Sequence, residues 1–77
     1  MIDPEVLKQH LRNAFPGAPV LELEDLTGTH DHYRAVIVHS AFQGKTRIEQ
    51  HKLVYQALGE LMHGPVHALA LETRAPD

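Results

Sequence analysis

Histidine is the residue type in this chain that offers the most chemistry. Seven histidines and no cysteine occur among 77 residues, so any metal chemistry must use imidazole and carboxylate groups. His67 opens the apolar run 68–71 directly after Gly64-Pro65-Val66. A histidine at the start of a short buried strand keeps its ring near solvent, where the neutral ring can ligate a soft or borderline metal. The residues alone favour the alternative, a histidine that caps or hydrogen-bonds the preceding turn.

A second pair of histidines lies in a polar segment. His30 and His32 flank Asp31 within residues 25–32. Two imidazoles at this spacing can reach one metal ion if the loop closes around it, whereas the alternative is a solvated turn rich in Asp, Gly and Thr. A joint site formed by this loop and His67 requires the loop to fold toward the start of the third strand.

The remaining reactive groups suggest docking more than catalysis. Lys45, Arg47 and Lys52 form a small basic cluster near the start of a predicted helix, which is either a solvated helix face or a docking patch for an acidic partner. Ser40 is the only serine and has no nucleophile-elbow motif around it. We therefore do not expect an enzyme.

Size and charge narrow the class of protein. A length of 77 residues with 43% hydrophobic residues predicts a single folded domain over residues 1–77 with a small core. The formal net charge of −3 disfavours a broad electrostatic grip on nucleic acid. No apolar run has the length of a membrane span, and residues 1–5 do not resemble a signal peptide. We expect a cytoplasmic protein without a membrane segment.

The first half of the chain predicts one helix and two strands. Asp3 is the expected N-cap and Pro4 the first helical residue, with Ile2 and Leu7 spaced for a hydrophobic staple. The helix presents an apolar stripe and ends at Pro16-Gly17; the stripe comprises Leu7, Leu11, Ala14 and Phe15. Alternation predicts a strand over Val20–Leu26. A run that is apolar on both faces predicts a central strand over Tyr33–Ser40.

The second half predicts a turn, a helix and a strand. Ala41–Lys45 is the expected turn, with Phe42 as its apolar anchor. Thr46 and Glu49 have the spacing of a capping box, and the helix after them is expected to run to about Met62. Its buried side comprises Val54, Ala57, Leu58, Leu61 and Met62, and His63-Gly64-Pro65 ends it.

A third strand over Val66–Thr73 completes the predicted order helix, strand, strand, helix, strand. Because strand–helix–strand crossovers join parallel strands, we expect an α+β fold with an αββαβ core. Its three-stranded mixed sheet has the helices packed on one face.

Three motifs in the second half of the chain resemble the BolA family. They are Phe42-Gln43-Gly44-Lys45, Gln50-His51-Lys52-Leu53-Val54-Tyr55 and His67-Ala68-Leu69-Ala70-Leu71-Glu72-Thr73. His32-Tyr33 is similar to the family's pair of a histidine and an aromatic residue. The resemblance implies an αββαβ core like that of a class II KH domain, with a short helical turn before the main helix.

The resemblance also implies a function. BolA-like proteins share a [2Fe-2S] cluster with a monothiol glutaredoxin and its glutathione, and His67 matches the ligand common to the family. The family's second ligand comes from the loop between the first two strands. His30 stands where that ligand is expected, while His32 matches the residue beside the aromatic and is the less favoured choice. The loop is short compared with that of many relatives.

The resemblance therefore predicts a non-enzymatic adaptor for iron–sulfur cluster assembly, cluster transfer or iron sensing, which is a monomer when free. The rival prediction is a KH-like transcriptional regulator that binds nucleic acid, a role that some BolA-like proteins have. The acidic net charge and the missing Gly-x-x-Gly loop weigh against it.

Overall fold

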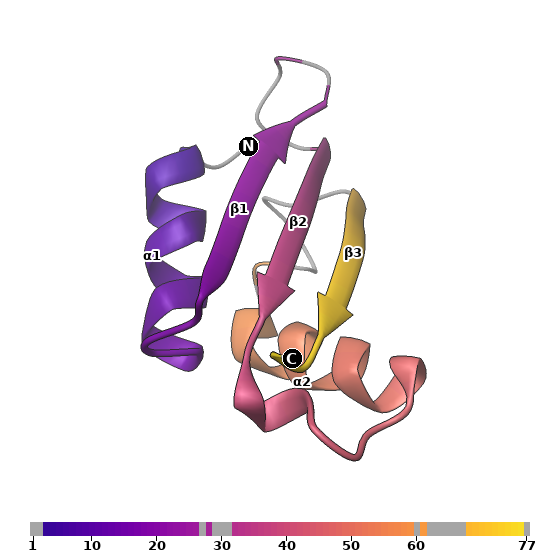
Figure 1. Cartoon of the computed structure of the whole chain (residues 1–77). Coiled ribbons are helices and arrows are strands. Elements are labelled where there is room, and N and C mark those ends of the chain that lie inside the picture. The colour runs from indigo at the N-terminus through magenta and orange to yellow at the C-terminus, as the bar shows by residue number, and fades with distance from the viewer. Residues whose placement is uncertain (1–2, 27, 29–31, 60, 62–67, 77) are drawn as a thin grey trace.

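The computed structural model describes residues 3–26, 28, 32–59, 61 and 68–76. The elements follow the predicted αββαβ order, with a short 3-10 helix, η1, before the second helix. They are α1 (Pro4–Ala14), β1 (Val20–Asp25), β2 (His32–Val38), η1 (Ser40–Phe42), α2 (Arg47–Leu58) and β3 (Ala68–Arg74). Together they form a small α+β unit (Figure 1).

The sheet has the strand order β1-β2-β3, so β2 is the central strand as predicted. β1 pairs antiparallel with β2, with Leu23 opposite Ala35. β3 pairs parallel with β2, with Ala35 opposite Leu71. The crossover through α2 thus joins two parallel neighbours, which is the arrangement that the order of elements predicted.

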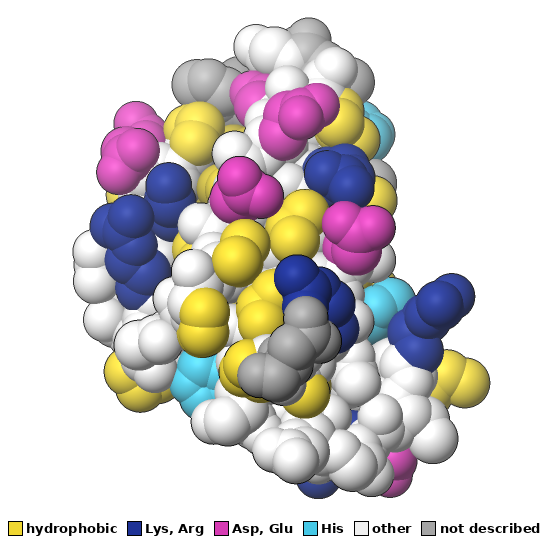
Figure 2. All heavy atoms as spheres, viewed as in Figure 1, with side chains coloured by type: hydrophobic (Ala, Val, Ile, Leu, Met, Phe, Trp, Pro, Cys, Tyr) yellow, Lys and Arg dark blue, Asp and Glu magenta, His cyan; other side chains and the backbone are white. Residues whose placement is uncertain are grey.

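The apolar core lies between the two helices and one face of the sheet. Residues Leu7 and Leu11 of α1, Tyr33, Ala35 and Ile37 of β2, and Val54 and Leu58 of α2 form it together with Phe15 and Phe42. Phe42 is fully buried, which confirms its predicted role as an anchor. The opposite face of the sheet lies open to solvent and carries charged side chains (Figure 2).

Helix α1 begins as its sequence predicts. The carboxylate of Asp3 accepts a hydrogen bond of 2.8 Å from the Glu5 N–H, and Pro4 is the first helical residue. Leu7 and Leu11 are fully buried. The predicted stripe is wrong at Ala14, which is exposed because the helix ends there and the chain turns so that Phe15 enters the core. Ile2, and with it the predicted staple, lies outside the described residues.

Two strands end earlier than predicted. β1 ends at Asp25 rather than Leu26, whose side chain is 50% exposed. β2 runs from His32 to Val38 rather than from Tyr33 to Ser40. It ends there because the His39 ring accepts a hydrogen bond from the Ala41 N–H, which caps η1 and turns the chain away from the sheet. β3 extends to Arg74, one residue beyond the predicted end.

Helix α2 has the predicted start but not the predicted end. The Thr46 side chain accepts from the Glu49 N–H at 3.2 Å and the Glu49 carboxylate accepts from the Thr46 N–H at 2.8 Å, so the capping box is confirmed. The prediction that the helix reaches Met62 is wrong, because it ends at Leu58 with Gly59 as C-cap at φ 54. A positive φ favours glycine, and the Gly59 N–H bonds to the Tyr55 carbonyl.

The predicted buried side of α2 is largely confirmed. Val54 and Leu58 are buried, and Ala57 and Leu61 pack against the core as partly buried residues. Met62 and the predicted terminator 63–65 lie outside the described residues. In the part of the chain that the structure describes, no helix has the length and apolar character needed to span a bilayer.

Candidate metal centre

The starts of β2 and β3 lie side by side at one end of the sheet (Figure 1). His32, the first residue of β2, pairs in register with Ala68, the first residue of β3. Asp25 at the end of β1 pairs with Tyr33 at the same end. His67 precedes Ala68 in the chain, and His30 precedes His32 by two positions. Both of these predicted ligands lie outside the described residues.

His32 is the predicted ligand whose position the structure describes. Its backbone carbonyl accepts a hydrogen bond of 2.9 Å from the Leu26 N–H, and its side chain is half-buried. The next residue, Tyr33, is fully buried in the core, so alternation directs His32 to the open face of the sheet. The buried tyrosine anchors the backbone that carries this imidazole.

The described residues do not complete a metal site around His32. Among the residues that the structure describes, no group of three His, Asp or Glu side chains is placed to hold a metal ion. The nearby Asp25 carboxylate accepts a hydrogen bond of 3.0 Å from the Gly28 N–H. Within that part of the chain, His32 is therefore an imidazole that needs ligands from elsewhere to complete a site.

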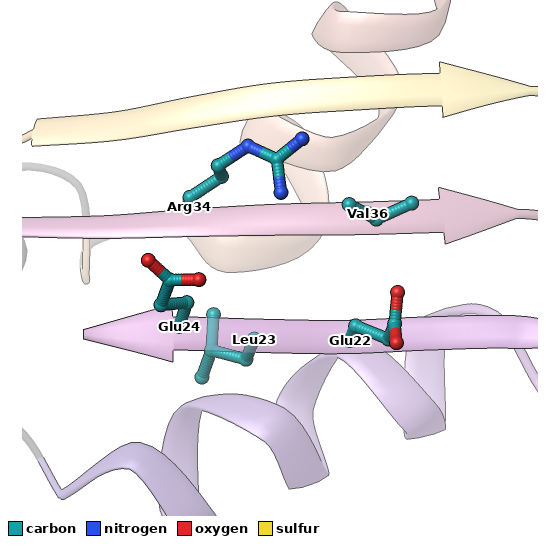
Figure 3. A pocket seen from close by; sticks show the side chains of 5 residues that line it. All are labelled: Glu22, Leu23, Glu24, Arg34 and Val36. Carbon is teal, nitrogen blue, oxygen red and sulfur yellow. The ribbon is translucent and has the colours of Figure 1, made fainter. Parts of the chain in front are cut away.

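The open face of the sheet beside this end is acidic. Glu22 and Glu24 project from β1 beside Arg34 and Val36 of β2 (Figure 3). The Arg34 guanidinium lies 3.0 Å from the Glu72 carboxylate of β3. Because both partners of this ion pair are largely exposed, it contributes at most about 1 kcal/mol. The ion pair engages the arginine that lines the same hollow as the two glutamates of β1.

The three predicted docking cations lie around the N-terminal half of α2 and are all exposed. Hydrogen bonds from Thr46 lower the pKa of Glu49, and the positive charges of Lys45 and Lys52 lower this pKa further. Arg47 instead lines a hollow between α2 and β3 together with His51.

Arg47 lies far from His32, the predicted metal ligand that the structure describes. The hollow beside Arg47 includes Thr73, which lies about 16 Å along β3 from Ala68 at the usual rise per residue. Arg47 therefore lies toward the other end of β3 from His32 and cannot contact the same ligand atoms as a small metal site there.

His39 has a structural role that the sequence did not predict. Its Nδ1 accepts from the Ala41 N–H at 3.0 Å, and its Nε2 lies 3.0 Å from the Pro16 carbonyl oxygen. These two contacts require a neutral ring protonated on Nε2. The ring also packs edge-on against Phe15. His39 thus joins the end of α1 to the end of β2. No local sequence motif predicts this contact, because the two residues are 23 positions apart.

Comparison with known proteins identifies the family. The family model for the BolA-like protein matches residues 5–77. BolA-like protein 1 of Mus musculus is 40% identical over 75 residues, which cover 97% of this chain and 50% of the mouse protein. The DNA-binding transcriptional regulator BolA of Escherichia coli is 35% identical over 81 residues, covering 95% of this chain and 75% of that protein.

A solved structure agrees with this comparison. The bolA protein homologue from Coxiella burnetii superimposes with a TM-score of 0.82 at 34% identity, covering 100% of this chain and 95% of that chain. This chain spans about half the length of the mammalian relatives that it matches.

The fold defines a small αββαβ protein in which a histidine opens the central strand beside the start of a parallel neighbour. The chain belongs to the BolA-like family.

Proposed function

We propose that this protein is an adaptor that binds a monothiol glutaredoxin and holds a [2Fe-2S] cluster jointly with it and its glutathione. His67 is the principal ligand, and His30 is preferred to His32 as the second. The observation that carries the proposal is the pairing of His32 with Ala68. It supports a shared site because His67 is joined to Ala68 by one peptide bond, and the segment containing His30 leads directly into His32.

The donor atoms available in this chain suit such a shared cluster. The protein has histidine but no cysteine, and two imidazoles can replace two thiolates on one iron of a [2Fe-2S] cluster. The other two ligands must then be sulfur atoms from the glutaredoxin and glutathione. When bound, the cluster supplies a one-electron redox centre that can be passed to a client protein.

The chain's own residues would position these ligands and make binding depend on pH. The buried Tyr33 and the strand pairing hold the start of β2 beside the start of β3, so the ligand-bearing segments begin from a fixed frame. Because only a neutral imidazole can ligate a metal, mild acidification should release the cluster. Lys45, Arg47 and Lys52 remain a proposed docking patch for an acidic surface of the glutaredoxin.

Anaerobic reconstitution tests the proposal. The protein, a monothiol glutaredoxin, glutathione, iron and sulfide are mixed, and visible circular dichroism and size-exclusion elution are recorded. We expect a 1:1 complex whose spectrum differs from that of the glutaredoxin homodimer. His67→Ala should abolish this spectrum. Of His30→Ala and His32→Ala, the variant that loses more of the cluster's circular dichroism signal identifies the second ligand.

His10→Ala is the matched control, because His10 lies exposed on α1 away from the starts of β2 and β3 and should leave the spectrum intact. An unchanged glutaredoxin spectrum with no complex in elution would remove the basis of the proposal. Far-ultraviolet circular dichroism of each variant establishes that it is folded.

Nucleic-acid binding is the second candidate function. The name of the Escherichia coli relative as a DNA-binding regulator favours it, and Lys45, Arg47 and Lys52 are the cations available to contact phosphate. Glu22 and Glu24 on the open sheet face oppose it. A DNA mobility shift at low micromolar protein that weakens steeply with salt would support this candidate.

A further inference from the structure

The outer edge of β3 borders a hollow on the surface. Its volume is about 270 Å³, and its walls are formed by Arg47 and His51 of α2 and by residues 71–73 of β3. β3 is an edge strand, because in the described part of the chain it pairs with β2 alone. A helix wall beside a strand edge is the arrangement that receives an extended peptide as an additional strand.

The backbone of β3 directs toward this hollow hydrogen-bonding groups that have no partner among the described residues. The Arg74 carbonyl accepts a hydrogen bond of 3.1 Å from the His39 N–H, so Arg74 directs its backbone groups toward the side of β2. Backbone direction alternates along a strand. Leu71 and Thr73 therefore direct their N–H and C=O groups toward the outer edge, and both residues line the hollow.

The hollow holds a cation that no described residue pairs, the Arg47 guanidinium, and the His51 imidazole lies beside it. The Glu72 carboxylate is engaged by Arg34 at 3.0 Å on the open face of the sheet. Arg47 and His51 make no side-chain hydrogen bond or ion pair with any residue whose position is described. Figure 2 shows histidine and basic side chains together at the edge where β3 approaches α2. An unpaired guanidinium beside a free strand edge favours a peptide that carries a carboxylate.

The walls of the hollow are held together before any ligand arrives. The Thr73 hydroxyl donates to the Gln50 Oε1 at 2.7 Å, and the Gln50 Nε2 donates to the Lys45 carbonyl at 3.0 Å. This network fastens the end of β3 to the start of α2, so a peptide would meet fixed walls and lose little affinity to their ordering.

We propose that this hollow binds an extended acidic segment of a partner protein. The segment adds as a fourth strand beside β3, with its backbone bonded to Leu71 and Thr73 and a glutamate or aspartate side chain facing Arg47 and His51. The hollow lies at the opposite end of β3 from the proposed cluster site, so the proposal does not depend on cluster binding.

A synthetic peptide tests this proposal without metal or glutaredoxin. The probe is an acetylated and amidated heptapeptide of alternating valine and glutamate, titrated into the ¹⁵N-labelled full chain. We expect saturable amide shifts at Leu71 and Thr73. Arg47→Gln should weaken binding about tenfold, the loss expected for one charge-assisted hydrogen bond. The same peptide with lysine in place of glutamate should not bind.

Two controls distinguish strand addition beside β3 from nonspecific electrostatic attraction of the peptide. Arg12→Gln removes the same charge from an exposed position on α1 and should leave the affinity unchanged. A peptide methylated on the backbone nitrogens of its pairing edge should lose binding, because it cannot bond to the strand. Equal weakening by Arg12→Gln and Arg47→Gln would overturn the proposal. Shifts located away from β3, or pairing of this edge with a second copy of the chain, would overturn it as well.

Discussion

The side chain of Gln50 joins α2 to β3, and a double-mutant cycle measures how much this joint contributes. Its Oε1 accepts from the Thr73 hydroxyl at 2.7 Å. Its Nε2 donates to the Lys45 carbonyl at 3.0 Å and, at the longer distance of 3.3 Å, to the Phe42 carbonyl. The variants are Gln50→Ala, Thr73→Val and the double variant. Each single change removes the bond between the two side chains.

The expected magnitudes follow from these bonds. A neutral hydrogen bond contributes about 1 kcal/mol net. Gln50→Ala loses two short bonds and one long bond, which predicts a loss of about 2 kcal/mol in the free energy of unfolding. Thr73→Val loses one bond and should cost about 1 kcal/mol. Because the two side chains share that bond, the double variant should cost about 2 kcal/mol, which gives a coupling free energy of about 1 kcal/mol.

Urea denaturation followed by circular dichroism measures all four free energies. In a domain of this size, the loss expected for Gln50→Ala also lowers Tm by about 8–16 °C. Thr73→Ser keeps the hydroxyl and serves as the control, because Gln50→Ala should then cost the same in both backgrounds and the coupling free energy of this cycle should vanish. If the costs of Gln50→Ala and Thr73→Val add to within about 0.3 kcal/mol, the bond between these side chains does not contribute to stability.

Three further changes test the turn before α2 and its cap. Phe42→Ala removes a fully buried ring and should lower the free energy of unfolding by about 3–5 kcal/mol. Thermal unfolding should then no longer show a cooperative transition above 37 °C. A variant that retains most of its stability would contradict the role of Phe42 as an anchor. Gly44→Ala should cost about 1 kcal/mol from backbone strain alone, since φ is +75° and nothing lies within 4 Å of an added Cβ; Gly44→Asn should cost less in the same urea assay. Because the folded pKa of Glu49 lies below its ordinary value of 4.5, its charge stabilises the fold above that pH and the contribution is lost as pH falls through the folded pKa. Glu49→Gln should therefore be less stable than the parent at pH 7 and match it in strong acid, and a difference that does not change with pH would refute this origin.

The element order could be predicted because local signals in this chain are strong. Asp3 and the pair Thr46 and Glu49 mark both helix starts, and the structure contains both caps. The helix end was mispredicted because Leu61 still packs against the core after the helix has ended, so the apolar spacing continues past Gly59. The positive φ of Gly59 ends the helix, and apolar periodicity carries no information about it.

The tertiary contacts could not be predicted in the same way. The starts of β2 and β3 meet because a strand–helix–strand crossover joins parallel strands. The position of the two strand starts beside each other could therefore be predicted from the sequence. The ring of His39 on Pro16 and the hydroxyl of Thr73 on Gln50 each join residues 23 positions apart. Such contacts have no local motif, because chain spacing does not specify which side chains meet after folding.

The candidate site forms only after β2 and β3 have paired, which requires the whole domain to fold. The hairpin of β1 and β2 forms from neighbouring residues, whereas Arg34 and Glu72 must meet across 38 positions. Contacts of this separation carry a larger loop-closure cost than the hairpin contacts and slow the folding of small domains. A ligand that spans the two strand starts therefore binds the native chain and no partly folded form. Its binding free energy adds to the stability of the whole domain by mass action, so loss of that ligand also lowers the resistance of the protein to unfolding and proteolysis.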